Sequence, residues 1–517
     1  MQIITLSDIK LPLGKGEDAL IALAQKKLGK KPAYFRIRKK SLDARDKENI
    51  KYIYSIEFSS TPQPTIQPEI ERLPKSKLPT SPVLVVGGGP AGLFCALQLL
   101  KRGVAPILIE RGAPVEERER IIQTFCDAKK LDAETNVQFG EGGAGTFSDG
   151  KLNTQTHSPL NEEVLKTFVE FGAPEEILWL NKPHIGSDNL KTVVKNMRTY
   201  LLQNGAQVLF YTRLDDIVLQ GNKVVGATLT NTRTGEKETL DVSALVLAVG
   251  HSARDTFEKL LSRGVCMRQK DFAVGVRIEH LQSAIGLAQY GKAYTKLPAA
   301  DYKLVSHASE RAAFTFCMCP GGYVMPAASE EGGVVTNGMS NFARNGVNAN
   351  SALIAQVSRA DFDDDSPLAG VRFQQKIERA AYKVGGGNYA APVQRVEDFL
   401  RGKTSQAFGE VLPTYGAGTT FADLHAVLPL GITQALKVSL LDMDKKLRGF
   451  AHPDALLTGA ETRTSSPLRI ERDKDSLQSV STANLYPCGE GAGYAGGITS
   501  SAADGIRVAN AVYASFL

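Results

Sequence analysis

Glycines at a fixed spacing, directly after an apolar strand, are the residues of this sequence whose chemistry is easiest to define. The run Val83-Leu-Val-Val-Gly-Gly-Gly-Pro-Ala-Gly92 has the spacing G-x-G-x-x-G. Gly87 permits a tight turn, Gly89 lets the backbone approach a pyrophosphate, and Gly92 lets the next helix pack against the strand. Free amides at the start of that helix, predicted over Leu93–Arg102, would bind phosphate oxygens. The pattern predicts a dinucleotide site.

An acidic residue stands where such a site needs one. Glu110 follows Gly87 by 23 residues and ends the next predicted strand, Pro106–Glu110. A carboxylate at this position accepts hydrogen bonds from ribose hydroxyl groups. Strand, glycine turn, helix, strand and acid together predict the site far more strongly than the glycine spacing does by itself.

The C-terminal segment repeats the order of strand, glycine loop and helix. Strand Leu485–Cys488 leads into the loop Gly489–Gly497, and a helix is predicted from about Thr499 to the end of the sequence. The loop contains a second G-x-G-x-x-G at Gly491–Gly496, but only 21 residues follow it. Because a helix and a further strand do not fit into that length, a second dinucleotide-binding unit is excluded.

This segment resembles the C-terminal flavin motif of FAD-dependent oxidoreductases of the glutathione-reductase-like superfamily. There, an acid after the strand meets the ribityl–phosphate part of FAD, and the next helix directs its N-terminus at the isoalloxazine. The resemblance implies the first role for Glu490 and the second for the amides around Ile498–Ser500. Val208–Gly250 resembles the superfamily's strand pair and the strand that follows it. The amides of a further glycine loop, Phe139–Thr154, could line the pyrophosphate or the flavin edge.

Over nearly its full length the chain resembles the bacterial FAD-dependent proteins that are also called NAD(FAD)-utilising dehydrogenases. Seven segments carry the resemblance: Gly140–Thr154, Lys182–Val194, Phe272–His280, Phe316–Pro326, Thr336–Ser351, Gly459–Ile470 and Tyr486–Gly505. The resemblance implies non-covalent FAD and leaves the substrate open. The residues that we expect to contact the cofactor are Gly87, Gly89, Pro90, Ala91, Gly92, Glu110, Arg111, Gly142, Gly143, Gly145, Ser148, Lys151, Gly250, Gly489, Glu490, Gly497, Ile498, Thr499 and Ser500.

Candidates for catalysis come from charged and imidazole side chains in the matching segments. His184, with Lys182 and Asp188 nearby in sequence, is the candidate for proton transfer, and Arg277 is the candidate for pairing with an anionic substrate. For any single histidine in these segments, His184 included, the alternative of a hydrogen-bonded structural residue is favoured. A larger charged set could converge on the flavin or form surface ion pairs: Arg277, Glu279, Glu461, Arg463 and Arg469.

Other patterns predict less. Gly145–Leu152 and Gly286–Ala293 nearly match a Walker A loop, but both lack the Ser or Thr that would ligate magnesium. Cys317 and Cys319 are one residue apart, whereas redox dithiols favour C-x-x-C. We therefore favour a pair of small core residues, with a substrate-facing thiol as the alternative. Because no Cys/His cluster at metal spacing accompanies them, no metal site is expected.

Composition indicates an ordinary globular protein with one unusual region. The 517 residues are 43% hydrophobic and 22% charged, with a net charge of +6. Residues 1–80 hold 16 Lys/Arg against nine Asp/Glu, so the basicity belongs to them. Apolar runs are too short to cross a bilayer, a secretory signal is absent, and six cysteines make no disulfide scaffold. A cytoplasmic protein is expected.

The order of predicted elements defines a fold class. We predict an α/β protein with a Rossmann-type FAD-binding domain, interrupted by a mixed α+β substrate domain and preceded by a small α+β domain. The boundaries are 1–80, including the proline-rich linker Thr61–Pro82, then 81–265, 266–477 and 478–517. Gln207–Asp216 and Val224–Asn231 are predicted as paired strands, and residues 266–477 as a less regular region of short strands and loops.

Three hypotheses about function follow. The first is a cytoplasmic FAD-dependent oxidoreductase that acts on a small molecule, with NADH or NADPH visiting the flavin transiently. The second is an RNA-linked flavoenzyme in which the basic segment Arg36–Arg45 contacts phosphates, although a solvated strand–loop edge is favoured there. The third is a non-catalytic flavin sensor or scaffold.

Overall fold

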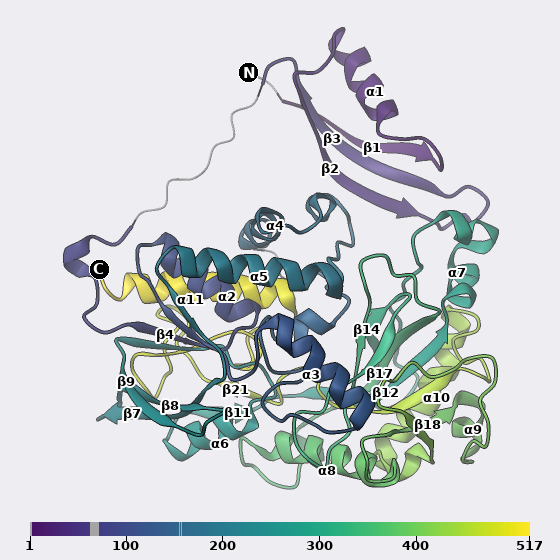
Figure 1. The fold of residues 1–517 in the computed structure, drawn as a ribbon. Coiled ribbons are helices and arrows are strands. Elements are labelled where there is room, and N and C mark those ends of the chain that lie inside the picture. The colour runs from purple at the N-terminus through teal and green to yellow at the C-terminus, as the bar shows by residue number, and fades with distance from the viewer. Residues whose placement is uncertain (1–2, 63–71, 155, 157) are drawn as a thin grey trace.

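A computed structural model describes residues 3–62, 72–154, 156 and 158–517 of the chain. Figure 1 shows a small unit from the N-terminus, an α/β region that contains both the purple-blue strands and the yellow C-terminal helix, and a green region beside it. The predicted α/β class is confirmed. Among the helices that the structure describes, none is long and apolar enough to cross a membrane. Residues 63–71, which belong to the predicted linker Thr61–Pro82, lie outside the described ranges.

A five-stranded parallel sheet organises the α/β region, in the order β22-β10-β4-β5-β6. Its strands are β4 (Val83–Val86), β5 (Ile107–Ile109), β6 (Gln207–Leu209), β10 (Ala244–Leu247) and β22 (Leu485–Pro487). The edge strand β22 comes from the C-terminal segment, with Leu245 beside Leu485. Consequently the two glycine motifs, far apart in sequence, follow strands of one sheet.

The residues of β4 point alternately to two covered faces. Val83 and Val85 pack against helices, whereas Leu84 and Val86 pack against a second, antiparallel sheet. The helices are α2 (Pro90–Lys101), α4 (Leu160–Glu170), α5 (Ser187–Gln203) and α11 (Ile498–Ala514), and α3 (Val115–Ala128) lies beside α5 (Figure 1). The second sheet contains β7 (Thr212–Gln220), β8 (Lys223–Asn231) and β9 (Lys237–Asp241), with α6 (Arg254–Ser262) against β7. Burial on both faces explains why β4, β5 and β10 are continuously apolar.

One predicted strand is divided in the structure. Gln207–Asp216 was expected to pair throughout with Val224–Asn231, but Gln207–Leu209 joins the parallel sheet and only residues from Thr212 onward pair with β8. Tyr211, whose φ is 54°, redirects the backbone between them. A non-glycine residue in this conformation leaves no trace in a hydrophobic pattern.

The region between β10 and β22 is more regular than expected. Its mixed sheet has seven strands in the order β13-β14-β17-β12-β20-β18-β19, and two antiparallel ribbons flank it. The sheet contains β12 (Phe272–Leu281), β13 (Val305–Ser306), β14 (Ala313–Cys319), β17 (Asn348–Val357), β18 (Ala391–Arg395), β19 (Thr419–Phe421) and β20 (Leu456–Glu461). The ribbons are β11 (Met267–Gln269) with β21 (Leu468–Ile470), and β15 (Tyr323–Pro326) with β16 (Thr336–Met339).

Helices cover this seven-stranded sheet. They are α7 (Gln282–Tyr290), α8 (Ala369–Val384), α9 (Val396–Arg401) and α10 (Leu430–Lys446). Short 3₁₀ helices occur along the chain: Lys75–Lys77, Ala144–Phe147, Glu175–Leu178, Gly291–Lys296, Arg359–Asp361 and Leu424–Ala426. The ten residues of β12 pair along their whole length with β17. Buried polar residues such as Arg277 and Asn350 interrupt the apolar pattern of these strands, which hid their length.

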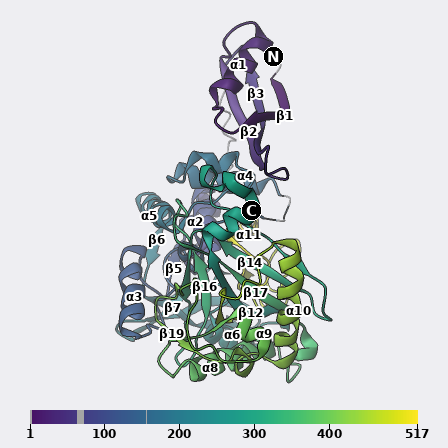
Figure 2. The ribbon, with the colours of Figure 1, turned by 90° about the vertical axis from the view of Figure 1, so that its right-hand side faces the viewer.

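The N-terminal unit is a three-stranded sheet with one helix and has its own core. Its elements are β1 (Ile4–Pro12), α1 (Asp18–Leu28), β2 (Tyr34–Asp43) and β3 (Lys51–Ser59). Figure 2 shows it standing apart from the rest of the molecule. The prediction placed the basic segment between strands, but most of it belongs to β2, which continues to Asp43. The outer edge of β2 reaches the main body, where the Lys40 amide donates to the Trp179 carbonyl at 2.8 Å.

Candidate dinucleotide and substrate cavity

A large cavity lies where the carboxyl ends of β4, β5 and β10 face the second region. Its volume is about 1550 Å³ when the open solvent at its mouth is included. The predicted cofactor residues that line it are Gly87, Gly89, Pro90, Ala91, Glu110, Arg111, Gly143, Gly145, Ser148, Lys151, Gly250, Glu490, Gly497 and Ile498. Segments from five separate parts of the sequence therefore meet there.

The glycine turn after β4 has the geometry that its spacing predicts. Gly87 has a φ of 108°, and a Cβ atom there would meet the Ala248 carbonyl oxygen at 2.3 Å. A Cβ atom at Gly92 would meet the Gly87 carbonyl oxygen at 1.9 Å. Helix α2 begins at Pro90, three residues earlier than predicted, and no described side chain caps it. Its first amides are therefore left beside the cavity for a ligand.

Glu110 organises this turn as well as lining the cavity. Its carboxylate is buried and accepts hydrogen bonds from the amides of Gly88 at 2.7 Å, Gly140 at 2.9 Å and Gly112 at 3.0 Å. Two oxygens offer about four acceptor positions in all, so one position is left for a ribose hydroxyl group. The acid thus joins the glycine turn to the loop that begins near Phe139.

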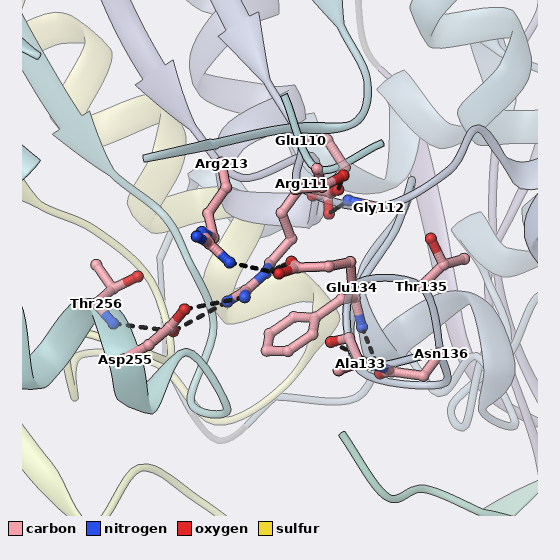
Figure 3. Close-up of polar contacts among 12 residues, drawn as sticks. Glu110, Arg111, Gly112, Ala133, Glu134, Thr135, Asn136, Arg213, Asp255 and Thr256 are labelled. Carbon is pink, nitrogen blue, oxygen red and sulfur yellow. Dashed lines mark hydrogen bonds and ion pairs between the residues drawn. The ribbon is translucent and has the colours of Figure 1, made fainter. Parts of the chain in front are cut away.

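Arg111 belongs to an ion-pair network at this end of the cavity, which Figure 3 shows. Its guanidinium group donates to Glu134 at 2.6 Å and to both carboxylate oxygens of Asp255 at 2.9 and 3.0 Å. It also lies over the ring of Phe139, 4.3 Å from the centroid. Arg213 joins the network through Glu134. Arg111 is therefore held rigidly, with the Phe139 ring exposed to the cavity.

The fully buried Arg118 shapes the glycine loop, and the sequence analysis missed it. From α3, it donates to the carbonyl oxygens of Asn136 and Val137 at 2.9 Å, Glu141 at 2.7 Å and Gly143 at 2.8 Å. Burial lowers the pKa of its guanidinium group to about 10. Its surroundings in sequence, Glu-Glu-Arg-Glu-Arg, are typical of an exposed helix face. No local signal could have identified it.

The C-terminal loop completes the cofactor side of the cavity. Helix α11 starts at Ile498 with no cap from a described side chain, so its N-terminal amides also lie beside the cavity. Burial raises the pKa of Glu490 to about 7. A Cβ atom at Gly491 would meet the Gly250 carbonyl oxygen at 2.3 Å, so this loop packs directly on the turn after β10.

The glycines that line the cavity test whether a dinucleotide fits. A Cβ atom at Gly250, Gly496 or Gly497 would meet no described protein atom within 4 Å, and one at Gly89 would approach only Gly143, at 3.8 Å. These backbone segments are therefore open on the side of the cavity. Together with two uncapped helix N-termini, they provide the amide donors that pyrophosphate and flavin oxygens need. The residues present fit FAD.

Some predicted cofactor residues do not line the cavity but support the backbone that does. The Gly142 amide donates to the Gly88 carbonyl at 2.8 Å, and the Gly489 amide donates to Asp504 at 2.8 Å. The Thr499 hydroxyl group donates to the Leu152 carbonyl at 2.8 Å, and the Ser500 hydroxyl group donates to Gly497 at 3.1 Å. With Gly92, these residues hold the turns and loops whose backbone borders the cavity.

The wall opposite the glycine loops is formed by the region between β10 and β22. It contains Phe316, Cys317, Cys319, Asn337, Gly338, Glu461, Arg463 and Thr464. Both cysteines therefore line the cavity, and whether a thiol faces substrate stays a prediction. Burial raises the pKa of Cys319 to about 11, and desolvation at the cavity wall raises that of the more accessible Cys317, so both thiols are protonated at neutral pH. The Lys151 amine reaches this wall and donates to the Met318 carbonyl.

Arg277 stands one layer behind this wall. It is fully buried and donates to both carboxylate oxygens of Glu461, at 2.6 and 3.0 Å. It also donates to the Cys317 carbonyl at 3.2 Å and to Asn350 at 2.9 Å. Its guanidinium group thus orients Glu461 and the Cys317 backbone. Its predicted direct contact with substrate does not match this position, because Glu461 and Cys317 lie between it and the cavity.

A second buried arginine does line the cavity. Arg463 donates to both oxygens of Glu378, which also accepts from Arg254. Burial would raise the pKa of Glu378, but the two arginines hold it far below its ordinary value. The same two cations, after burial itself, lower the pKa of the cavity residue His251 to about 3. His251 is therefore neutral and acts as a hydrogen-bonding group.

His184, the predicted proton-transfer residue, lies elsewhere. Its Nε2 lies 3.0 Å from the Phe342 carbonyl, its ring stacks on Phe342, and its backbone bridges Lys151. Burial, followed by the charge of Arg344, lowers its pKa. His184 thus supports the backbone of Lys151 from outside the cavity lining. This is the structural role that was weighed against catalysis.

Comparisons with known proteins agree with this geometry. Residues 271–464 match the family described as FAD-dependent protein, C-terminal domain-like, and residues 81–260 match pyridine nucleotide-disulphide oxidoreductases. Residues 3–59 match a domain of unknown function. Both larger matches are flavoprotein or dinucleotide-oxidoreductase families, and they cover the two sides of the cavity.

Two relatives show how far the similarity extends. An uncharacterised protein of Clostridium beijerinckii is 45% identical over 498 residues, covering 93% of this chain and 92% of that protein. NADH:fumarate oxidoreductase of Klebsiella pneumoniae is 24% identical over 205 residues, covering 32% of this chain and 20% of that protein. The chain belongs to the family of FAD-dependent oxidoreductases that includes the Clostridium protein, as the sequence resemblance predicted.

Solved structures resemble the chain only distantly. A geranylgeranyl bacteriochlorophyll reductase-like protein of Thermoplasma acidophilum is 14% identical with a TM-score of 0.37, covering 84% of this chain and 78% of that one. Glycerol-3-phosphate dehydrogenase of Bacillus halodurans, complexed with FAD, is 15% identical with a TM-score of 0.34, covering 84% and 64%. The family assignment rests on the sequence relatives and not on these structures.

Proposed function

We propose that this protein binds FAD non-covalently in the large cavity and exchanges an electron pair with a small molecule held against the opposite wall. One observation carries the proposal: two glycine motifs about 400 residues apart in sequence border one cavity, each at an uncapped helix N-terminus. A glycine turn without a binding role would not be expected to border the same cavity as a second glycine turn. The division into domains at residues 80, 265 and 477 is part of the same proposal.

The chain would hold FAD through its backbone. The amides at the start of α2 would bind the pyrophosphate, Glu110 would accept from a ribose hydroxyl group, and the start of α11 would face the flavin. FAD supplies the hydride or electron-pair chemistry when it is bound. The partial positive charge at the N-terminus of α11 would stabilise negative charge on the reduced flavin. Glu490 would accept from a hydroxyl group of the linking chain.

Substrate would contact the wall formed by β14, β16 and the segment after β20. Lys151 has no carboxylate partner among the described residues, so its ammonium group is available to an anionic or strongly polar substrate. Asn337 adds an amide at the same wall. Arg277 would be a positioning residue that orients Glu461 through its two hydrogen bonds. His251, which is neutral, would donate or accept a hydrogen bond without changing charge.

NADH or NADPH is the proposed electron donor. The described residues contain one parallel sheet, and its glycine turn would be occupied by FAD. A nicotinamide donor would therefore approach the flavin from the open mouth of the cavity and leave after transfer. A cytoplasmic location, where these donors are available, belongs to this proposal.

Anaerobic stopped-flow reduction tests the proposed activity. FAD-loaded protein mixed with NADH or NADPH should lose its flavin absorbance near about 450 nm at a rate that saturates with the dinucleotide. Reoxidation by members of a metabolite collection would then define the substrate class. A flavin that dithionite bleaches, but that no dinucleotide reduces and no metabolite reoxidises, would contradict an oxidoreductase function while leaving FAD binding intact.

A further inference from the structure

A basic groove lies on the outer side of the loop that carries Glu490. It runs between the β11–β21 ribbon and the turn after β17, and its volume is about 920 Å³ counted to its open mouth. Four lining side chains are basic and one is acidic: Arg268, Lys270, Arg359 and Arg469, with Asp271. Arg469 was one of the charged residues that the sequence analysis singled out, and the large cavity leaves it unexplained.

Three of these cations have no carboxylate partner within 4.0 Å among the described residues. Arg268 pairs with Glu471, but Lys270, Arg359 and Arg469 form no such ion pair. Arg359 donates to the Gln269 carbonyl at 3.2 Å, and Arg469 donates to the Gly493 carbonyl at 3.1 Å. Arg277, by contrast, is neutralised by the carboxylate of Glu461.

The backbone holds these cations near one another. The Lys270 amide donates to the Pro467 carbonyl at 3.0 Å, and Gln269 is the strand partner of Leu468, so Lys270 and Arg469 extend from adjacent paired segments. The bond from Arg359 to Gln269 places the third cation at the same ribbon. Burial, and then the charge of Arg469, lowers the pKa of Lys270, with Glu490 and Asp271 acting in the opposite direction. The cations repel one another, whereas Asp271 is the acidic side chain of the groove and the Tyr494 ring lies against Arg469, 4.9 Å from its guanidinium carbon.

We propose that this groove binds phosphate groups. Two guanidinium forks and an ammonium group match the several oxygens and the multiple charge of phosphate or pyrophosphate better than a single carboxylate. Arg359 and Arg469 both line the groove, and their carbonyl partners use only part of each guanidinium group. Two sources share this chemistry: inorganic phosphate or pyrophosphate, and the phosphates of a dinucleotide such as NADPH. Only the second source depends on the proposed function.

Calorimetric titration of the FAD-loaded full-length protein with inorganic pyrophosphate tests the site. At low ionic strength, where exposed charges are least screened, the wild type should show saturable binding. Arg359→Gln should weaken it at least about tenfold, because charge-assisted hydrogen bonds to one cation are lost. Arg359 is exposed, so this variant should fold normally. Arg379→Gln, which removes an exposed arginine of α8 outside the groove, is the matched control and should bind as the wild type does.

A competition arm identifies the source. If NADPH displaces pyrophosphate and NADH does so much less well, the groove takes the additional phosphate of the dinucleotide. If neither dinucleotide competes, the ligand is free phosphate or pyrophosphate. Absence of saturable pyrophosphate binding to the wild type, or equal binding by the Arg359→Gln and Arg379→Gln variants, would overturn the proposal. Neither result would bear on flavin reduction, which the stopped-flow experiment measures separately.

Discussion

Gly92 lies so close to Gly87 that the smallest side chain would collide with the Gly87 carbonyl oxygen. The glycine turn therefore depends on the lack of a Cβ atom at its glycines. Glu110 and Arg118, by contrast, hold the turn and the adjoining loop through hydrogen bonds to backbone groups. Residues of both kinds act on the shape of the backbone, and the backbone is what a dinucleotide would contact. Mutational effects at this site should accordingly appear in cofactor binding before they appear in chemistry.

Gly92→Ala should abolish FAD retention. A Cβ atom 1.9 Å from the Gly87 carbonyl oxygen forces α2 away from the strand and displaces the amides of the turn. We expect purified Gly92→Ala protein to contain less than about a tenth of the wild-type flavin, measured by absorbance after denaturation. Gly16→Ala, where a Cβ atom meets no described atom within 4 Å, is the control. Wild-type flavin content in Gly92→Ala would refute this view of the turn.

Glu490 predicts a specific pH dependence for the protein without FAD. Its pKa is raised from 4.5 to about 7, so the native state binds a proton that the unfolded chain has released between these values. The contribution of this group to stability is present below the unfolded pKa and is lost as pH rises through the folded pKa. From about pH 5 to pH 8, wild type should lose more than about 1 kcal/mol of unfolding free energy relative to Glu490→Gln.

Urea unfolding of both FAD-free proteins across this pH range measures the difference. Comparing the two proteins removes the opposite trend of carboxylates whose pKa values are lowered by ion pairs, because these are the same in both. Parallel pH profiles would show that the Glu490 carboxyl is solvated in the cavity.

The residues that could be identified from the sequence belong to short local motifs, whereas the residues that were missed do not. Gly87, Gly92 and Gly497 belong to motifs whose spacing is set by one turn and one helix. Arg118, by contrast, is buried only because the glycine loop wraps around it. Likewise, Arg277 carries a charge that suggested substrate binding, but Glu461, 184 residues further along, neutralises it. Pairings of this kind depend on the tertiary fold and cannot be read from nearby residues.

At the level of elements, the loop from Asn136 to Gly143 connects the two sides of the cofactor site. It receives hydrogen bonds from Arg118 on α3, and its Gly140 amide donates to Glu110 at the end of β5. The loop has little regular structure of its own. Its conformation therefore depends on these buried polar contacts.

Arg118→Lys should loosen this loop and weaken FAD binding. Lysine has a single ammonium group and cannot reach the carbonyls that the guanidinium fork joins. Leaving buried carbonyls without donors should reduce the free energy of unfolding by at least about 3 kcal/mol. Thermal unfolding and flavin release together measure the effect. Arg120→Lys, on the exposed side of the same helix, is the control. Equal flavin affinity in Arg118→Lys and wild type would contradict the role of Arg118.

Element prediction succeeded where apolar content and burial agree. β4, β10, α2 and α11 were found within a few residues because both faces of the parallel sheet are covered. β12 and β17 were underestimated because buried Arg277, Glu279 and Asn350 make a core strand look polar. The break at Tyr211 was missed since a positive φ in a tyrosine has no sequence signature.

For the whole molecule, the N-terminal unit is attached to the flavoprotein body through few contacts. Its β2 edge exchanges backbone hydrogen bonds with the segment around Leu180, and Lys47 donates to the Ala288 carbonyl at 2.8 Å. The side chain of Trp179 packs against the core of the unit. The described residues of the unit lie outside the cavity lining, so its net positive charge is remote from the proposed flavin site.

Lys40→Pro should loosen the attachment of the unit to the body without affecting FAD. The Lys40 amide points to Trp179 and not to β3, so proline removes this one hydrogen bond between the units while the pairing with β3 persists. Trp179 is the single tryptophan of the chain, and its fluorescence should shift to longer wavelength as water reaches it. Lys40→Ala keeps the amide and serves as the control. Unchanged emission, or loss of flavin, in Lys40→Pro would contradict this view of the attachment.

Flavin content of the purified protein decides whether the cavity holds FAD. The protein should be yellow, absorb near about 450 nm, and release FAD rather than FMN on denaturation, with roughly one FAD per chain, as expected of a non-covalent flavoenzyme. Released FAD should rebind to the wild type and fail to rebind to Gly92→Ala. A correctly folded, colourless wild-type protein that takes up no added FAD would contradict the account.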